Sequence, residues 1–182
     1  MNKHVQWSNL EKPGSESLKI KNVDSSLVAE GVVLLATDGD VRKFSYQVVT
    51  DEEWTTKTVE VTNHEQHAQL FLYCKEGKWY RRDKELREMS GAVDVDLSIT
   101  PFSNSLHINR FTWENGQERK LDVLYIDASN FELLNLAQHY TYEGNADDGN
   151  RLFQYRCRDY RTIITVDEDG FVVDYPGVFL RR

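Results

Sequence analysis

VDVDLSITPFSNSL, residues 93–106, changes its pattern halfway along. Its first part alternates strictly between apolar and acidic residues, which is typical of a β-strand. Its second part opens with Thr100, which can satisfy a free amide at a helix start, and with Pro101, which suits the first helical position. Phe102 and Leu106 then lie four residues apart, one above the other on a helix. We therefore predict a strand that leads directly into a short helix over residues 100–107.

Alternation with a period of two dominates the chain on both sides of this stretch. It recurs in short segments, at 44–48, 57–61, 68–74, 121–126 and 162–166. Dipeptides that tolerate positive φ lie between segments and are expected to close hairpins: Asp38-Gly39, Glu76-Gly77, Asn115-Gly116 and Asp169-Gly170. Because no long helical pattern recurs between strands, parallel βαβ units are not expected. We predict a mostly β fold whose antiparallel sheet is closed or rolled.

Residues 130–139 fit two structures. Their Glu, Leu and Ala residues favour a helix. A strand is favoured instead by the alternation of Leu134, Leu136, Gln138, Tyr140 and Tyr142. The pattern leaves both possibilities open.

Size, charge and composition limit the classes of protein. The 182 residues can share one hydrophobic core, so we expect a single domain over residues 1–182. The net charge of -8 opposes binding to nucleic acid or to an anionic membrane surface, because both depend on clustered Lys and Arg. No apolar run resembles a signal peptide or a membrane span, so we expect a cytoplasmic protein without stable membrane insertion, in which Cys74 and Cys157 stay reduced.

Asp94 and Asp96 are the first candidates for chemistry. Two residues apart in a strand, they share one face, with Cβ atoms roughly 7 Å apart. In a hydrolase of a sugar conjugate, one carboxyl of such a pair could act as the general acid and the other as the general base. The interpretation that we favour is structural: the carboxylates accept backbone hydrogen bonds or pair with Arg110, and so fix the strand against the helix.

Polar residues of the predicted helix form the best candidate for ligand binding. Asn104, His107 and Arg110 could together bind a sugar hydroxyl, a phosphate or a carboxylate. The alternative is that His107 and Arg110 are cations that interact favourably with the negative end of the helix dipole, at the C-terminus of the helix. Their closeness in sequence to the aspartate pair favours a binding site.

Large aromatic residues occur on separate predicted strands and could be platforms for sugar rings and acyl chains. They are Tyr46, Trp54, Trp79, Tyr155 and Tyr175. The alternative is ordinary packing, since a rolled sheet needs large side chains to fill its interior.

No metal site, catalytic residue or cofactor is expected. His64 and His67 invite a metal interpretation, but no third ligand is near them in the sequence. Glycine motifs for phosphate binding, nucleophile elbows and kinase signatures are absent from the sequence.

Residues 94–106 resemble the signature of the bacterial putative glycolipid-binding family, and the resemblance extends nearly end to end. The other matching residues are Trp7, Pro13-Gly14, Glu16, Tyr46, Asp51, Trp54, Gly77-Lys78-Trp79 and 169–177. The sequence departs from the family in two places: Ala92 replaces a cysteine, and residues 107–110 replace a proline and paired arginines.

The resemblance implies a spiral β-roll, in which a long antiparallel sheet wraps around a single short α-helix, and a homodimer. It also implies non-catalytic binding of a glycolipid or a similar amphiphile, with the apolar tail in the interior of the roll. The head group would then lie near Asp94, Asp96, Asn104, His107 and Arg110. The two alternatives are a hydrolase that uses Asp94 and Asp96, and a dimeric structural or interaction module without a ligand.

Overall fold

The computed structural model describes residues 1–37 and 39–182. In this part of the chain fifteen strands form one sheet. The elements in chain order are β1 (Asn2–Asn9), β2 (Gly14–Val23), β3 (Ser26–Thr37), β4 (Asp40–Asp51), β5 (Thr56–Asn63), β6 (Ala68–Lys75), β7 (Lys78–Arg81), β8 (Lys84–Glu85), the 3-10 helix η1 (Arg87–Met89), β9 (Asp94–Leu97), the α-helix α1 (Phe102–Asn109), β10 (Glu118–Ile126), β11 (Leu133–Asn145), β12 (Arg151–Cys157), β13 (Tyr160–Val166), β14 (Val172–Tyr175) and β15 (Phe179–Arg181).

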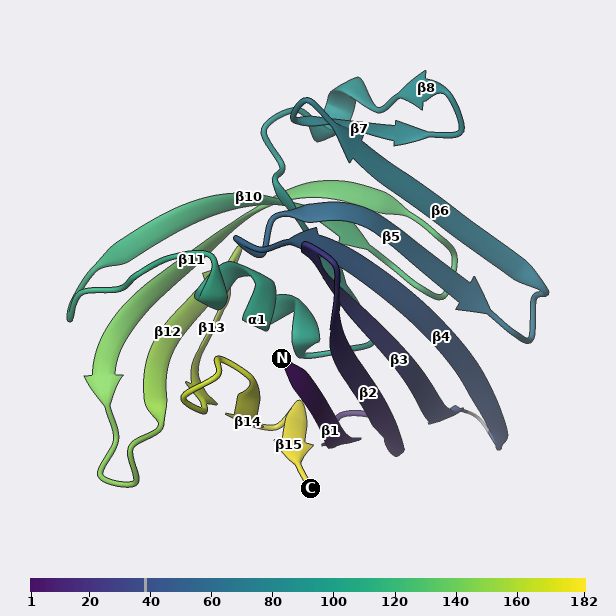
Figure 1. Ribbon diagram of the computed structural model, residues 1–182. Helices are drawn as coiled ribbons and strands as arrows, with labels where there is room; N and C mark the ends of the chain where they lie inside the picture. The colour runs from purple at the N-terminus through teal and green to yellow at the C-terminus, as the bar shows by residue number, and fades with distance from the viewer. Residues whose placement is uncertain (38) are drawn as a thin grey trace.

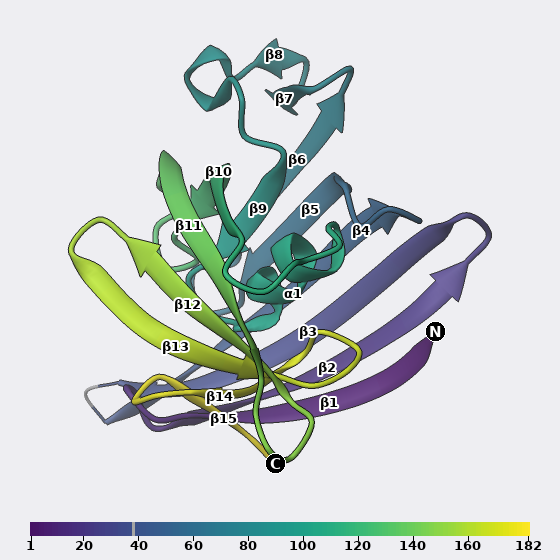
Figure 2. The ribbon, with the colours of Figure 1, turned by 90° about the vertical axis from the view of Figure 1, so that its left-hand side faces the viewer.

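The sheet consists of two runs of strands that meet at the chain ends, and all neighbours except β9 and β10 are antiparallel. β1 pairs with β15, so β2 to β8 continue the sheet on one side and β14 to β9 continue it on the other. Both runs curve, and the sheet wraps around α1 (Figures 1 and 2). The predicted fold class, a long sheet rolled around one short helix, is confirmed.

One strand pair differs from the prediction. β9 and β10 are parallel, with α1 as the connection between them, so the prediction of a sheet without a βαβ unit is wrong here. The physical reason is that the chain enters α1 directly after the four residues of β9 and crosses the interior before it returns beside β9. A helical connection of this kind can join parallel neighbours, whereas a tight turn cannot.

Two of the predicted turns close hairpins and one does not. Glu76-Gly77 joins β6 to β7, and Asp169-Gly170 joins β13 to β14, as predicted. Asn115-Gly116 instead precedes β10, where the Gly116 N–H donates to the Tyr142 carbonyl at 2.7 Å. The fourth turn, Asp38-Gly39, includes Asp38, which lies outside the described residues.

The helix begins two residues later than predicted. Thr100 Oγ1 does accept the Phe102 N–H at 3.0 Å, but Pro101, with φ -78° and ψ -7°, is the residue at the N-cap. Every residue from Phe102 to Ile108 is buried. Residues 133–145 are a strand, which decides between the two structures left open for residues 130–139.

The core surrounds α1 on several sides. The Phe102 ring stacks with Tyr46 and with Phe171, at centroid distances of 6.5 and 6.3 Å. Since the helix is enclosed, its polar side chains also face the interior and need partners there. In the described part of the chain no helix is long and apolar enough to cross a bilayer.

Candidate functional site

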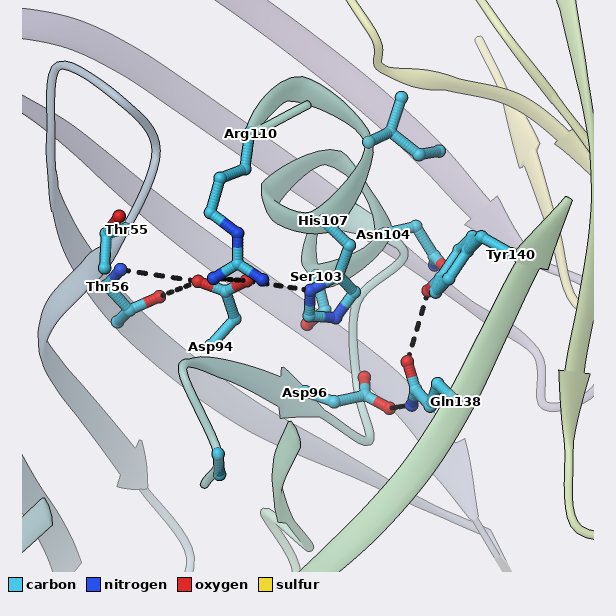
Figure 3. A network of polar contacts seen from close by, with 12 residues as sticks. Thr55, Thr56, Asp94, Asp96, Ser103, Asn104, His107, Arg110, Gln138 and Tyr140 are labelled. Atoms are coloured by element: carbon cyan, nitrogen blue, oxygen red, sulfur yellow. Dashed lines mark hydrogen bonds and ion pairs between the residues drawn. The ribbon is translucent and has the colours of Figure 1, made fainter. Parts of the chain in front are cut away.

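Asp94 on β9 is the centre of a buried polar network, and 1% of its surface is exposed. Its carboxylate lies 2.7 Å from Arg110 Nη1 and accepts a hydrogen bond of 3.1 Å from His107 Nδ1 (Figure 3). The backbone N–H and the hydroxyl of Thr56 on β5 both donate to it at 3.4 Å. The network joins β9, β5 and the end of α1. Removing one partner of a buried ion pair leaves the other charge uncompensated, so these contacts hold the three segments together. The predicted pairing of Asp94 with Arg110 is confirmed.

His107 has one partner and one free nitrogen. Nδ1 donates to Asp94, because a carboxylate can only accept. Nε2 is buried and has no hydrogen-bond partner among the described residues. Figure 3 shows the imidazole between the two aspartates. An Asp94–His107 pair could therefore orient the ring and leave Nε2 for another group.

Asp96 lies in a different environment, because this residue is partly exposed whereas Asp94 is buried. Gln138 Nε2 donates to it at 2.5 Å. Burial raises the pKa of Asp96, and this effect is opposed by the nearby His107 and by hydrogen bonds from Gln138 and Ser103. Asp96 therefore keeps acceptor capacity that Asp94 has already used.

Tyr140 links Asp96 to α1, because it contacts both Gln138, the partner of Asp96, and Asn104 on the helix. Its hydroxyl lies 2.8 Å from Asn104 Oδ1 and 3.2 Å from Gln138 Oε1. Asn104 in turn donates to the Pro101 carbonyl at 3.1 Å. The predicted residues Asp96 and Asn104 are thus brought together through two residues of β11 (Figure 3).

A row of tyrosine rings leads from this network to the surface. Ring centroids are 5.1 Å apart for Tyr140 and Tyr155, 6.1 Å for Tyr155 and Tyr175, and 6.2 Å for Tyr175 and Tyr160. Exposure rises from 1% at Tyr140 to 44% at Tyr160. Burial raises the pKa of Tyr155 and Tyr175, so both phenols stay neutral. We call Tyr140, Tyr155, Tyr175 and Tyr160 the tyrosine row.

The other three aromatic candidates lie apart from this network. The Trp79 indole is buried and donates to the Ala92 carbonyl at 2.8 Å. Trp54, in the turn between β4 and β5, packs edge-on against Phe171 at 6.1 Å. Tyr46 is buried on β4, and its hydroxyl donates to Glu16 at 2.5 Å.

Glu16 on β2 is a second buried acid that the sequence-based candidates did not include. Oε1 accepts hydrogen bonds from Tyr46 and from the Thr100 hydroxyl, the latter at 2.7 Å. Oε2 is buried without a partner among the described residues. Burial raises the pKa of Glu16 to about 8. A signal was present, because Glu16 shares the inner face of its strand with Leu18 and Ile20.

The described residues contain no group of three His, Cys, Asp or Glu side chains placed to hold a metal ion. The space inside the roll, where an apolar tail is expected, is occupied by α1 and the side chains around it. The groups that remain accessible beside the network are Asp96 and the outer members of the tyrosine row.

A family model described as "Putative glycolipid-binding" matches residues 4–181. The fold is similar to the crystal structure of a DUF1089 family protein from Pseudomonas aeruginosa, with a TM-score of 0.75, 25% sequence identity and coverage of 92% of each chain. No curated protein matches the sequence.

Proposed function

The chain belongs to the putative glycolipid-binding family, and from this premise we propose that it binds a glycolipid or a similar amphiphile without catalysing a reaction on it. The sugar head group contacts Asp96 and the tyrosine row, and the apolar tail extends along the aromatic rings. The observation that carries the proposal is that Asp96, a partly exposed residue, lies beside the tyrosine row.

The side chains of Asp96 and the tyrosine row suit a sugar head group. A carboxylate accepts hydrogen bonds from sugar hydroxyls, and the flat rings of tyrosine offer apolar faces with polar edges. Asp96 has an acceptor site left for a guest, whereas Asp94 is already bound by Arg110, His107 and Thr56. In this proposal Asp94, Asn104, His107 and Arg110 hold the wall of the site in place.

The raised pKa of Asp96 supports a second candidate, a hydrolase of a sugar conjugate. A carboxyl group whose pKa is raised by burial can act as a general acid. Asp94, two residues away on β9, is paired with Arg110. Release of p-nitrophenol from p-nitrophenyl glycosides by the wild-type protein, lost in Asp96→Asn, would favour this candidate over simple binding.

A third candidate is a dimeric interaction module. Val32, Leu34 and Val41 are exposed on the outer face of β3 and β4, by 43%, 42% and 64%. Burial of this apolar surface between two copies would support the homodimer that we propose, in a cytoplasmic setting. Light scattering coupled to gel filtration measures the mass, and Val32→Glu should then yield a monomer.

The binding proposal is tested with octyl β-glucoside below its micellar concentration, titrated into the protein in a calorimeter. Tetraethylene glycol monooctyl ether has the same tail without a sugar and should bind more weakly. Asp96→Asn should weaken the binding of octyl β-glucoside by about 10- to 100-fold, since a hydrogen bond to a charged group contributes about 1.5–3 kcal/mol and about 1.4 kcal/mol corresponds to a tenfold change. The matched control is Asp122→Asn, an exposed position on β10. Equal affinity of wild type and Asp96→Asn for the glucoside would contradict the proposed site.

A further inference from the structure

A cleft of about 290 Å³ opens at one end of the roll, away from the tyrosine row. Four segments that are far apart in the sequence form it: the β1–β2 turn, the paired ends of β3 and β4, the connection from β9 to α1, and the end of β10. The cleft shares no lining residue with the tyrosine row. A ligand in this cleft would therefore occupy a site separate from the one proposed at Asp96 and the tyrosine row.

The floor and the walls of the cleft differ in chemistry. The buried side chains of Leu35, Phe44 and Ile99 lie among its lining residues. Lys12 and Arg42, both exposed, bring one cation from the β1–β2 turn and one from the start of β4. Neither has a carboxylate within 4.0 Å among the described residues, in contrast to the pairs formed by Lys3, Lys21, Lys57 and Arg110. The cations are thus available to a ligand.

The β10 side of the cleft carries acceptors and hydroxyls. Asp127 Oδ1 accepts both the N–H and the hydroxyl of Ser129, at 2.8 and 2.6 Å, and these bonds fix the carboxylate. Its other oxygen, Oδ2, has no hydrogen bond from a described residue and can accept one from a ligand. Ser98 and Tyr125 add two more hydroxyl groups.

We infer that this cleft binds a polyhydroxylated anion, the class that includes phosphorylated and carboxylated sugars. The anionic group pairs with Lys12 and Arg42, and ring hydroxyls donate to Asp127. The volume of about 290 Å³ lies just below the range of small-molecule pockets, roughly 300–1,000 Å³, which suits one sugar ring better than an oligosaccharide. The apolar floor can contact the carbon face of such a ring.

Calorimetric titration with glucose 6-phosphate tests the inference. Arg42→Gln and Lys12→Gln should each weaken binding about tenfold, and Asp127→Asn should weaken both glucose 6-phosphate and glucose. Arg161→Gln is the matched control, because it removes one exposed cation from β13. Inorganic phosphate lacks the sugar hydroxyls and glucose lacks the anionic group, so each should bind more weakly than glucose 6-phosphate.

Two results would overturn the inference: affinity unchanged in Arg42→Gln and Lys12→Gln, or inorganic phosphate bound as tightly as glucose 6-phosphate. The side chains of Lys12 and Arg42 are exposed, so the variants should keep the wild-type melting temperature. Co-sedimentation with phosphatidylcholine vesicles, with and without phosphatidylinositol, separates the sources of the ligand. Binding only to the free ester assigns a soluble sugar ester, and binding to the phosphatidylinositol vesicles as well assigns a lipid head group.

Failure here is distinguishable from failure of the proposed function. Arg42→Gln should leave the affinity for octyl β-glucoside at the tyrosine row unchanged, and Asp96→Asn should leave the affinity for glucose 6-phosphate unchanged.

Discussion

Replacing Glu16 with glutamine should remove a large pH dependence of stability. The Glu16 carboxyl is buried between Tyr46 and Thr100, and no cation compensates it among the described residues. Its pKa is about 8 in the folded chain, against an ordinary value of 4.5. The folded protein therefore keeps a proton that the unfolded chain loses as pH rises above 4.5.

The sign and size follow from proton linkage. Between the two pKa values the folded state binds more protons than the unfolded state, so the free energy of unfolding falls as pH rises. The two pKa values differ by about 3.5, and each pKa unit corresponds to about 1.36 kcal/mol, so the total loss is about 5 kcal/mol. The loss is complete above about pH 8, where Glu16 is ionised in both states. This is a large fraction of the roughly 5–15 kcal/mol that stabilises an ordinary domain.

Glutamine keeps the acceptor for Tyr46 and Thr100 but never ionises. Its amide N–H groups lie where Oε2 already lacks a partner, so Glu16→Gln should cost about 1–3 kcal/mol near pH 5. Near pH 9 the variant should instead be more stable than the wild type by about 2–4 kcal/mol. The two stability curves should therefore cross.

Urea unfolding followed by tryptophan fluorescence, at several pH values from about 5 to 9, gives both curves. The carboxyls of Asp51 and Asp167 have lowered pKa values, so their contribution is lost only at more acidic pH. Glu76→Gln, exposed in the β6–β7 turn, is the control and should follow the wild type. Parallel curves for wild type and Glu16→Gln across this range would refute the reasoning.

Three further outcomes are expected. Arg110→Met should lower the free energy of unfolding by about 3–5 kcal/mol, because Asp94 then loses its guanidinium, and adding Asp94→Asn should restore part of this loss in urea unfolding. Gly31→Ala should lower the melting temperature, since its new Cβ would collide with the Tyr46 ring, and an unchanged temperature would contradict that packing. Tyr160→Ala should weaken octyl β-glucoside several-fold in calorimetry at an unchanged melting temperature, because the ring is 44% exposed.

The sequence predicted local structure better than long-range pairing. Alternation at residues 94–97 and the threonine-proline start of the helix depend on near neighbours, and the structure has both elements. The pairing of β1 with β15 and the parallel pairing of β9 with β10 join segments that no local pattern connects. The rolled shape was expected from the family resemblance, since alternation alone allows several closed or open sheets.

In the candidate site, too, contacts between residues near in sequence could be predicted better than contacts between distant strands. Asp94, His107 and Arg110 lie within seventeen residues, so their meeting could be predicted from a strand that leads into a helix. Gln138 and Tyr140 come from β11, and only the packing of that strand against β9 and α1 makes them partners of Asp96 and Asn104. Residue type alone could not show that Trp54 and Trp79 lie apart from the network whereas Tyr155 lies beside it, because aromatic side chains serve both packing and binding.

The two buried acids explain why ligands are expected at the edges of the roll. Glu16 bonds to Thr100 at the start of α1, and Asp94 pairs with Arg110 at its end, so a buried acid fixes each end of the helix. A guest in the space that α1 occupies would have to displace the helix, which would break both contacts and unstack Phe102 from Tyr46 and Phe171. Binding beside the helix, at Asp96 or in the cleft near Lys12 and Arg42, leaves these contacts intact. The anchored helix therefore acts as a fixed wall against which both proposed sites are built.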